Sequence, residues 1–361
     1  MTQDATHSRQ IVHIGPGAFH RAHQAVYTHD ATQADGSDWG ITAVSLRSTK
    51  IADTLNAQNG RYTLVIREEA GPRYRVINSI SRALTGAKGL EPVLVALAAP
   101  ATRIVSLTVT EKAYHQVQSP DETNVIRVLT EALSRRKAAG LAGVTLLSCD
   151  NLPNNGAVLR RAVLGYAQQQ DPDLAAWIES NCSFPSTMVD RITPATTPDL
   201  IAMVERDTGW ADQIPVETEP FTQWIIEDDF VQDRPAWDAA GALLVADVKP
   251  YEDMKLRMLN GAHSMLAYAG HLTGKTYVRD VMADSCLSAR VADHITAAAG
   301  TLAPIADIDF TAYRDALLAR FKNPDIAHKT FQIAMDGSQK MPPRIFMPAI
   351  EAAQRGQDIA P

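Results

Sequence analysis

Cysteine is scarce in this sequence. Cys149, Cys182 and Cys286 are an odd number, lie far apart and form no CxxC pair. This spacing argues against a disulfide framework and against a cysteine-rich zinc site. We interpret all three side chains as buried thiols.

Long apolar runs and basic blocks are also missing. No apolar run approaches the roughly 18 residues that span a bilayer, and the polar start, MTQDATHSRQ, lacks the layout of a signal peptide. A net charge of -7 without a basic block excludes a broad positive field for nucleic acid. We therefore expect a cytoplasmic protein with a small-molecule ligand and no nucleic-acid or membrane partner. Monomer and homo-oligomer both stay open.

The sequence is long and apolar enough for more than one core, with 361 residues of which 45% are hydrophobic. In its first half, apolar runs alternate with helical stretches, and each run ends in polar residues. The runs are RQIVHI, WGITAVSLRS, RIVSLTVTE and GVTLLSCDN, with an amphipathic helix closed by Gly140 before the last. The alternation predicts an α/β fold with a Rossmann-like, doubly wound parallel sheet, whose ligand lies at the carboxyl ends of the strands.

Strand signals fade after about residue 217, where longer helical stretches such as SARVADHITAAAG and TAYRDALLARF follow. We predict a dinucleotide-binding domain over residues 1–216. A mostly α-helical substrate and catalytic domain is expected over residues 217–361.

A glycine turn follows the first predicted strand. Gly15 and Gly17 occupy the first two positions of GxGxxG, and His20 takes the third. Amides at the start of a helix bind pyrophosphate, and glycine lets the phosphate approach the main chain. The two glycines alone fit a structural turn equally well, but their place in the first strand–turn–helix unit favours a dinucleotide site.

The second predicted strand ends in SLRS rather than in the acid that binds the ribose hydroxyls of NAD. Arg47 in this loop could hold the 2'-phosphate of NADP, so these residues leave NAD and NADP open. The candidate cofactor-binding residues are Gly15, Gly17, Ala18, Phe19, Arg47, Thr110, Glu111 and Lys112.

Four histidines, His13, His20, His23 and His29, crowd the glycine turn. His20 and His23 can share a helix face, but no carboxylate or cysteine completes a zinc pattern. We predict no metal. We expect these imidazoles to hydrogen-bond within the fold or to line the cofactor cleft.

The helical stretch at residues 254–268, MKLRMLNGAHSMLAY, carries polar residues among apolar ones. At about 100° per residue, Glu252, Lys255, Asn260 and His263 fall within an arc of roughly 140° and can face one pocket. A desolvated lysine can act as a base and a carboxamide can bind an oxyanion, which suits a dehydrogenase without zinc.

A structural interpretation of the same stretch stays open. Lys255 would extend to solvent, Asn260 would mark an irregularity before Gly261, and His263 would be a satisfied core histidine. Tyr251 and Lys255 also match the YxxxK pair of short-chain dehydrogenases. We treat that match as coincidence because the pair falls in the helical half.

Six segments closely resemble the polyol-specific long-chain dehydrogenases, the family of mannitol 2-dehydrogenase and fructuronate reductase. They are IVHIGPGAFHRAHQAVYTHD, SLTVTEKAYH, SCDNLPNNG, FPSTMVDRITPAT, EPFTQWIIEDDF and MKLRMLNGAHS. Together these motifs are highly specific and extend over most of the chain. The resemblance implies an NAD-dependent, zinc-independent oxidoreductase that acts on the CH–OH group of a polyol or sugar acid.

The resemblance also assigns roles. The Lys-x4-Asn-x2-His signature of the family falls on Lys255 as general acid and base, Asn260 as oxyanion donor and His263 as substrate-orienting residue. Asn151 is implied as the second oxyanion donor. The residues implied on the substrate side are Asp190, Arg191, Glu252, which relays the proton of the lysine, and Lys340.

The segment QIAMDGSQK resembles the uronate reductases of the family, because mannitol-type members carry arginine and histidine where this chain has Gln332 and Met335. We therefore expect reduction of D-fructuronate to D-mannonate. Interconversion of D-mannitol and D-fructose, and reduction of tagaturonate, are the alternatives. A substrate carboxylate needs a cation, for which Lys340, with Arg191 behind it, is the candidate.

Family members usually continue in further helices beyond the point where this sequence ends, so the resemblance implies a second domain shortened at its C-terminus. The competing interpretation is a catalytically inactive dinucleotide-binding module. The retained lysine, carboxamides and histidine argue against it, because binding alone needs no amine beside an oxyanion site. NAD remains the expected cofactor on the resemblance.

Overall fold

The computed structural model describes residues 7–109, 112–115, 121–306, 308–324 and 328–356. Their contacts divide the chain into two units, Met1–Val248 and Lys249–Pro361. The division falls later than the expected boundary at 216/217. The reason is that strands after residue 215, β9 (Val216–Thr218) and β10 (Gln223–Glu227), pair with strands of the first unit.

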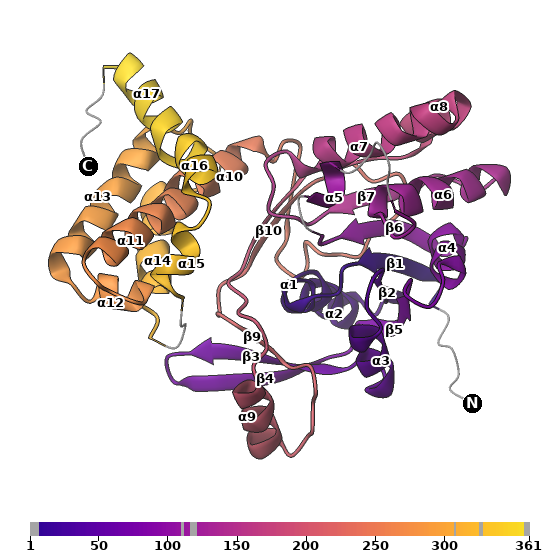
Figure 1. The fold of residues 1–361 in the computed structure, drawn as a ribbon, viewed down its shortest axis with the longest axis horizontal. Helices are drawn as coiled ribbons and strands as arrows, with labels where there is room; N and C mark the ends of the chain where they lie inside the picture. Colours follow the sequence, from indigo (N-terminus) through magenta and orange to yellow (C-terminus); the bar gives the residue numbers. More distant parts are fainter. Residues whose placement is uncertain (1–6, 110–111, 116–120, 307, 325–327, 357–361) are drawn as a thin grey trace. The chain divides into compact units, whose positions relative to one another are not determined.

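A five-stranded sheet in the order β5-β2-β1-β6-β7 forms the centre of the first unit (Figure 1). All neighbouring strands in it are parallel, which confirms the predicted Rossmann-like fold. Apolar runs predicted four of its strands. The strands are β1 (Arg9–Ile14), β2 (Trp39–Ser45), β5 (Ile80–Thr85), β6 (Thr102–Leu107) and β7 (Thr145–Ser148).

Alternate residues of these strands face two separate cores. Ile11 and Ile41 face one core, and Val12 and Val44 face the other. Helices cover both faces, which is why the strands read as continuous apolar runs. The helices of this unit are α1 (Ala18–Ala22), α2 (Gln24–Asp35), α3 (Lys50–Ala57), α4 (Glu91–Ala98), α5 (Lys112–His115), α6 (Val125–Ala138), α7 (Asn155–Gln170), α8 (Pro172–Asn181) and α9 (Pro198–Thr208).

Two three-stranded sheets complete the first unit, and neither was predicted from the sequence. One joins β9 to the hairpin of β3 (Tyr62–Glu68) and β4 (Gly71–Ile77). The other joins β10 to β8 (Thr187–Asp190) and β11 (Leu243–Val245). Most of these strands are too short to show a clear period.

The second unit is helical, as predicted, and packs around apolar residues such as Met254, Leu266 and Leu317. Two of its segments are π-helical, and these are named η1 and η2. The elements are α10 (Lys249–Met254), η1 (Lys255–Asn260), α11 (Gly261–Leu272), α12 (Val278–Met282), α13 (Ser285–Gly300), α14 (Phe310–Lys322), α15 (Thr330–Ala334), α16 (Gly337–Met341), η2 (Pro342–Phe346) and α17 (Met347–Gln354).

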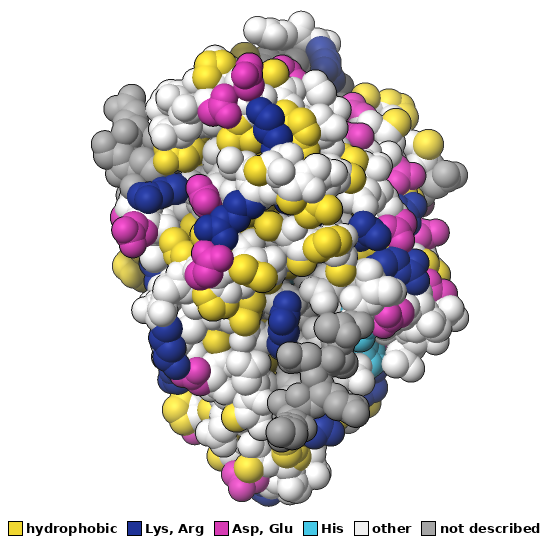
Figure 2. Space-filling view, turned by 90° about the vertical axis from the view of Figure 1, so that its right-hand side faces the viewer, with side chains coloured by type: hydrophobic (Ala, Val, Ile, Leu, Met, Phe, Trp, Pro, Cys, Tyr) yellow, Lys and Arg dark blue, Asp and Glu magenta, His cyan; other side chains and the backbone are white. Residues whose placement is uncertain are grey.

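The surface carries mixed charge. Figure 2 shows basic and acidic side chains interspersed over one face of the molecule, as a modest net charge of -7 leads one to expect. Within the described ranges, every helix is too short or too polar to cross a membrane.

The three thiols differ in exposure. Cys149 is buried, Cys182 is half-buried and Cys286 is exposed. The prediction of buried thiols is therefore confirmed for Cys149 and wrong for Cys286. Cys286 lies in the first turn of α13, on the side of that helix that faces solvent.

Candidate active site

The glycine turn joins β1 to α1 at the point where the sheet order reverses between β1 and β6, which is where α/β sheets bind ligands. Gly15 has a φ of +95°, and a Cβ built on it would lie 2.0 Å from the carbonyl oxygen of Thr108. The amide of Gly17 donates to the carbonyl of Gly15 at 2.7 Å. Glycine is the residue that allows both this φ and this close approach.

Gly17 leaves open space above the turn. A Cβ built on it would meet only the Gly15 carbonyl oxygen, at 3.9 Å. Ala18 and Phe19 follow in the first turn of α1, where main-chain N–H groups have no acceptor within the helix. An exposed glycine beside such amides fits the pyrophosphate of a dinucleotide.

His13 lies beneath this turn and is held at both ring nitrogens. Its Nδ1 is 2.8 Å from Ser106 Oγ, and its Nε2 is 2.9 Å from Thr108 Oγ1. The Thr108 hydroxyl in turn donates to the carbonyl oxygen of Gly15 at 2.6 Å. Burial lowers the pKa of His13 to about 3, so the ring is neutral near pH 7. The ring of His20 stacks on it at a centroid distance of 3.4 Å.

Two other histidines of the predicted cluster also bond within the fold. His23 Nε2 is 3.0 Å from the carbonyl oxygen of Gln223, and His29 Nδ1 is 2.7 Å from Asn78 Oδ1. The expectation that these imidazoles hydrogen-bond internally is thus confirmed for His13, His23 and His29. Among the residues with described positions, no group of three or more histidine, cysteine or acidic side chains is placed to hold a metal.

The remaining predicted cofactor residues follow β2 and β6. Arg47 is exposed, and its guanidinium lies 3.7 Å from the carboxylate of Asp121, which is a weak surface pair. Thr110 and Glu111 lie outside the described residues. Lys112 begins α5, and for this residue the structure describes the main chain alone.

Asn151 follows β7 and is exposed, directly after the buried Asp150. The carboxylate of Asp150 accepts from the amide of Val109 at 2.7 Å and from the hydroxyl of Tyr114. Burial raises the pKa of Asp150 to about 7, and the bonds from Tyr114 and Val109 oppose that rise. These bonds tie the segments after β6 and β7 together beside Asn151. This pair is not evident from the sequence, because Asp150 and Tyr114 are 36 residues apart.

Asp190 is the last residue of β8 and is buried, as is Arg191 after it. The guanidinium of Arg191 donates to the main-chain carbonyls of Ala22 at 2.5 Å and Glu219 at 3.2 Å. Burial lowers the pKa of Arg191 to about 10. Because its donors connect main-chain segments, this position favours a bracing role over the binding of a substrate carboxylate.

Lys255 and Asn260 are the first and last residues of η1. A π-helix bonds residues five apart and so brings such residues nearly into line, whereas an α-helix turns them well away from each other. The expectation of a regular 100° step is therefore wrong over this segment. Around the helix axis, Lys255 and Asn260 therefore lie at a smaller angle to each other than in a regular α-helix. Single π-helical turns are frequent at functional sites.

The structural interpretation of this helix fails at two residues. Lys255 is only 7% exposed, so its side chain does not extend to solvent. His263 is half-buried as a residue, and its buried Nε2 has no hydrogen-bond partner within the described part of the chain. It is therefore not a satisfied core histidine.

Burial holds the pKa of His263 well below its usual value, and neighbouring cations lower it further. The imidazole is consequently neutral near pH 7, with one nitrogen left to bind. The cations that act on it are His328 when protonated, Arg320, Arg344 and Lys255.

Close packing explains the glycine within the signature. A Cβ on Gly261 would lie 2.9 Å from Nε2 of His294 and 3.2 Å from the carbonyl oxygen of Arg344. Gly261 therefore lets α13 and η2 approach the end of η1. Arg344 and His294 were not predicted, since both reach this point from other helices.

The two other predicted residues of this unit lie in neighbouring helices. Glu252 is half-buried in α10, one turn before Lys255. The ammonium of Lys340, in α16, donates to the carbonyl oxygen of Ile333 at 3.4 Å. Burial and then the charge of Arg344 lower the pKa of Lys340.

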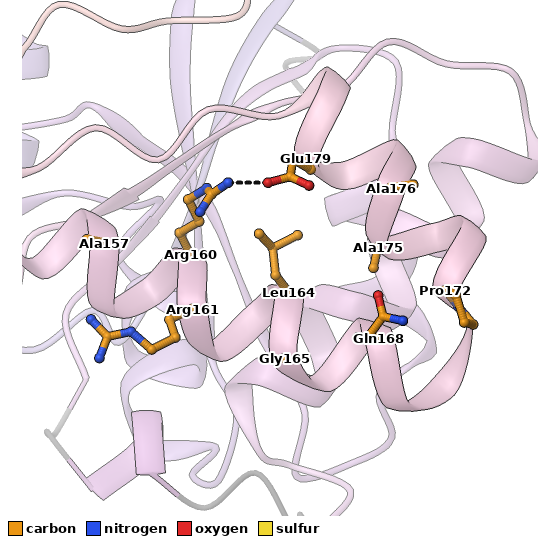
Figure 3. A pocket seen from close by; sticks show the side chains of 10 residues that line it. All are labelled: Ala157, Arg160, Arg161, Leu164, Gly165, Gln168, Pro172, Ala175, Ala176 and Glu179. Carbon is orange, nitrogen blue, oxygen red and sulfur yellow. Dashed lines mark hydrogen bonds and ion pairs between the residues drawn. The ribbon is translucent and has the colours of Figure 1, made fainter.

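A surface groove of about 600 Å³ lies between α7 and α8 (Figure 3). The guanidinium of Arg160 pairs with the carboxylate of Glu179 across it. None of the predicted site residues lines this groove, so it is not the candidate active site. Its lining residues are Ala157, Arg160, Arg161, Leu164, Gly165, Gln168, Pro172, Ala175, Ala176 and Glu179.

Known proteins resemble this chain over most of its length. The D-mannonate oxidoreductase of Escherichia coli is 44% identical over 97% of this chain and 77% of its own length. The D-arabinitol 4-dehydrogenase of Ralstonia nicotianae is 40% identical over 96% of this chain and 79% of its own. A solved structure, Pseudomonas fluorescens mannitol 2-dehydrogenase with NAD and D-mannitol, matches 98% of this chain and 77% of its own, with 38% identity and a TM-score of 0.87.

Two family models together cover almost the whole sequence. The mannitol dehydrogenase Rossmann domain matches residues 9–239, and the mannitol dehydrogenase C-terminal domain matches residues 247–360. The second match begins close to the division between the two units. The chain therefore belongs to the mannitol dehydrogenase family, and it is a polyol or sugar-acid dehydrogenase.

Proposed function

We propose that this protein reduces a keto-uronate to an aldonate with NADH, and that the substrate pair is D-fructuronate and D-mannonate. The observation that carries the proposal is the buried Lys255 on one π-helical turn with Asn260, followed by the neutral His263. The relative named D-mannonate oxidoreductase, at 44% identity, supports the choice of substrate. So does the segment QIAMDGSQK, which resembles uronate reductases.

We assign the cofactor site to the glycine turn. Gly15, Gly17 and the first amides of α1 would hold the pyrophosphate of NAD, because Gly17 leaves the turn open on that side. The related mannitol 2-dehydrogenase structure contains NAD, which supports NAD over NADP. When bound, NADH supplies a hydride to the ketone carbon of the substrate.

The side chains of the helical unit then handle the charge and the proton. As the ketone oxygen becomes negative, the carboxamide of Asn260 donates an N–H to it, and Asn151 is the second amide donor that we assign. Lys255, as ammonium, transfers a proton to this oxygen, and the product is the hydroxyl of the aldonate. In the reverse direction Lys255, as amine, accepts that proton.

Two further side chains support this step. His263 is neutral, so its Nε2 can hydrogen-bond a substrate hydroxyl without adding another positive charge beside Lys255. Glu252, one helical turn before Lys255, can pass the proton between the lysine and solvent. Asp190 is assigned to the substrate side from the family resemblance.

The test of this function is NADH consumption, followed optically, with D-fructuronate, tagaturonate and D-fructose supplied separately. We expect the highest kcat/KM with fructuronate. Turnover of fructose alone would replace the proposed substrate with D-mannitol and D-fructose, and a preference for tagaturonate would replace it with the epimeric acid. Turnover of none of the three, with NADH still bound, would favour the inactive binding module.

A further inference from the structure

Arg344 is a cation beside the candidate catalytic residues, and the described part of the chain gives it no acidic partner. It lies in η2, which packs against η1. Its Nη1 is 3.4 Å from the carbonyl oxygen of Asn260 and 3.2 Å from Ser264 Oγ. Over the described parts of the chain, no carboxylate pairs with this guanidinium. By contrast Arg257, within η1 itself, pairs with Glu351 at 2.8 Å.

The surroundings of Arg344 are positively charged. The groups whose charges act on His263 are all basic, and Arg344 is one of them. Lys340, one helical turn before Arg344, also feels its charge, and the acid that acts on Lys340 is the exposed Asp336. A cation that is partly withdrawn from water without a counter-ion, as Arg344 is among the described residues, is unfavourable, and a bound anion relieves that cost.

The guanidinium has donors to spare. Arginine carries five N–H donors in a planar fork, and the contacts to Asn260 and Ser264 both use Nη1. Nε and Nη2 therefore remain for a carboxylate, which arginine binds through two parallel hydrogen bonds. The other predicted candidates are less suited, because Arg191 bonds main-chain carbonyls and Lys340 offers a single point charge.

We propose that Arg344 binds the carboxylate of the sugar acid and so sets the preference of the enzyme for uronates over uncharged sugars. This inference rests on the proposed function. It replaces Lys340 and Arg191 as the main carboxylate ligand and leaves Lys340 as a second cation nearby. Because Arg344 touches the main chain of Asn260, the carboxylate and the reacting oxygen would be held by adjoining groups of one helical unit.

The first test compares an acid with an uncharged sugar. We expect Arg344→Gln to raise the KM for D-fructuronate by about ten- to a hundredfold, as loss of a charged hydrogen bond does, and to leave kcat/KM for D-fructose within about twofold. Arg344→Lys keeps the positive charge but loses the planar pair of N–H donors. Its KM for D-fructuronate should therefore lie between those of the unaltered protein and Arg344→Gln. The matched control is Arg355→Gln, because the Nη1 of Arg355 also donates to a main-chain carbonyl, that of Thr301 at 3.1 Å. Arg355→Gln should leave the KM for D-fructuronate and the kcat/KM for D-fructose unchanged.

A binding measurement separates this inference from the proposed function. Calorimetry on the NADH-loaded protein compares D-mannonate with D-mannitol. NADH can oxidise neither compound, so the measurement reports binding without turnover. Tighter binding of mannonate to the unaltered protein, lost in Arg344→Gln, supports the inference. An undiminished mannonate preference in Arg344→Gln overturns it, while fructuronate turnover by the unaltered protein would still uphold the function.

Two more outcomes contradict the carboxylate site. If Arg344→Gln weakens mannonate and mannitol equally, Arg344 positions Asn260 and does not bind the acid. If the unaltered protein reduces only fructose and binds mannonate no better than mannitol, both the inference and the proposed substrate are wrong.

Discussion

The glycine turn of the first unit and the π-helical segment of the second differ in which part of the chain the proposed function assigns to ligand binding. At the turn the main chain is presented, and the side chains of His13 and Thr108 lie beneath it and hold its shape. In η1 the proposal relies on the side chains of Lys255 and Asn260, and the main chain departs from the regular α-helix between them. Substitutions at the turn should therefore act through conformation, and those in η1 through chemistry.

The largest effect is expected at Lys255, where a substitution should act through chemistry. Lys255→Ala removes the proton donor and leaves the glycine turn intact, so kcat should fall about 10³-fold while the Kd for NADH stays within about twofold. Turnover assays and fluorescence titration with NADH measure the two quantities. Lys322→Ala is the control, because Lys322 is exposed near the end of α14. Near-normal turnover in Lys255→Ala would remove Lys255 from the mechanism.

The conformational half is tested at Gly15. Gly15→Ala combines a φ of +95° with a Cβ only 2.0 Å from the Thr108 carbonyl oxygen. We expect a loss of about 3 kcal/mol of unfolding free energy and weaker NADH binding, measured by urea denaturation and titration. Gly36→Ala is the matched control, with a φ of +66° but open space around it, and should cost about 1 kcal/mol. Equal losses in the two variants would show that the close approach to Thr108 does not matter.

The smallest expected effect is the pH dependence of stability that comes from Asp150, which bonds the segments after β6 and β7 together. The pKa of Asp150 is raised to about 7, so between its ordinary value and pH 7 the folded state binds more protons than the unfolded state. The contribution of Asp150 to stability therefore falls as pH rises, by about 1 kcal/mol between pH 6 and pH 8. Asp150→Asn should flatten the pH dependence by that amount in urea denaturation. Parallel curves for the two proteins would contradict the raised pKa.

His13 gives the opposite sign and serves as an internal contrast. Its pKa is lowered to about 3, so the unfolded state binds more protons than the folded state between pH 3 and pH 6.5. Its contribution to stability is present above that range and is lost as pH falls through it. The titrations of His13 and Asp150 thus overlap little above pH 6.

The sequence predicted the parts of the fold that depend on local pattern. Buried parallel strands are apolar over several residues, so four strands of the main sheet stood out, whereas β5, ISRALT, carries a serine and an arginine and was missed. The short strands of the two small sheets have no measurable period. The boundary at 216/217 was placed too early because β9 and β10 belong to the first unit through pairings with strands far away in sequence.

The candidate site divides in the same way. The glycine turn and the Lys-x4-Asn-x2-His signature are short motifs and could be found from the sequence. The π-helical turn could not, because a periodicity argument assumes one helical repeat throughout. Arg344 was not predicted, because it contacts Asn260 across 84 residues of sequence and no local pattern indicates a contact of that kind.

The π-helical turn also has a consequence for insertions and deletions. Its hydrogen-bonded ring holds one residue more than the ring of an α-helix, so η1 carries the equivalent of a single inserted residue. Removing one residue among 256–259 would allow the segment to become an ordinary α-helix, continuous with the helices on either side. Such a deletion would leave the amine and the carboxamide four residues apart in a continuous α-helix, at about 40° around its axis. Their alignment would therefore survive the loss of the extra residue, whereas a regular α-helix of the present length would separate them by about 140°.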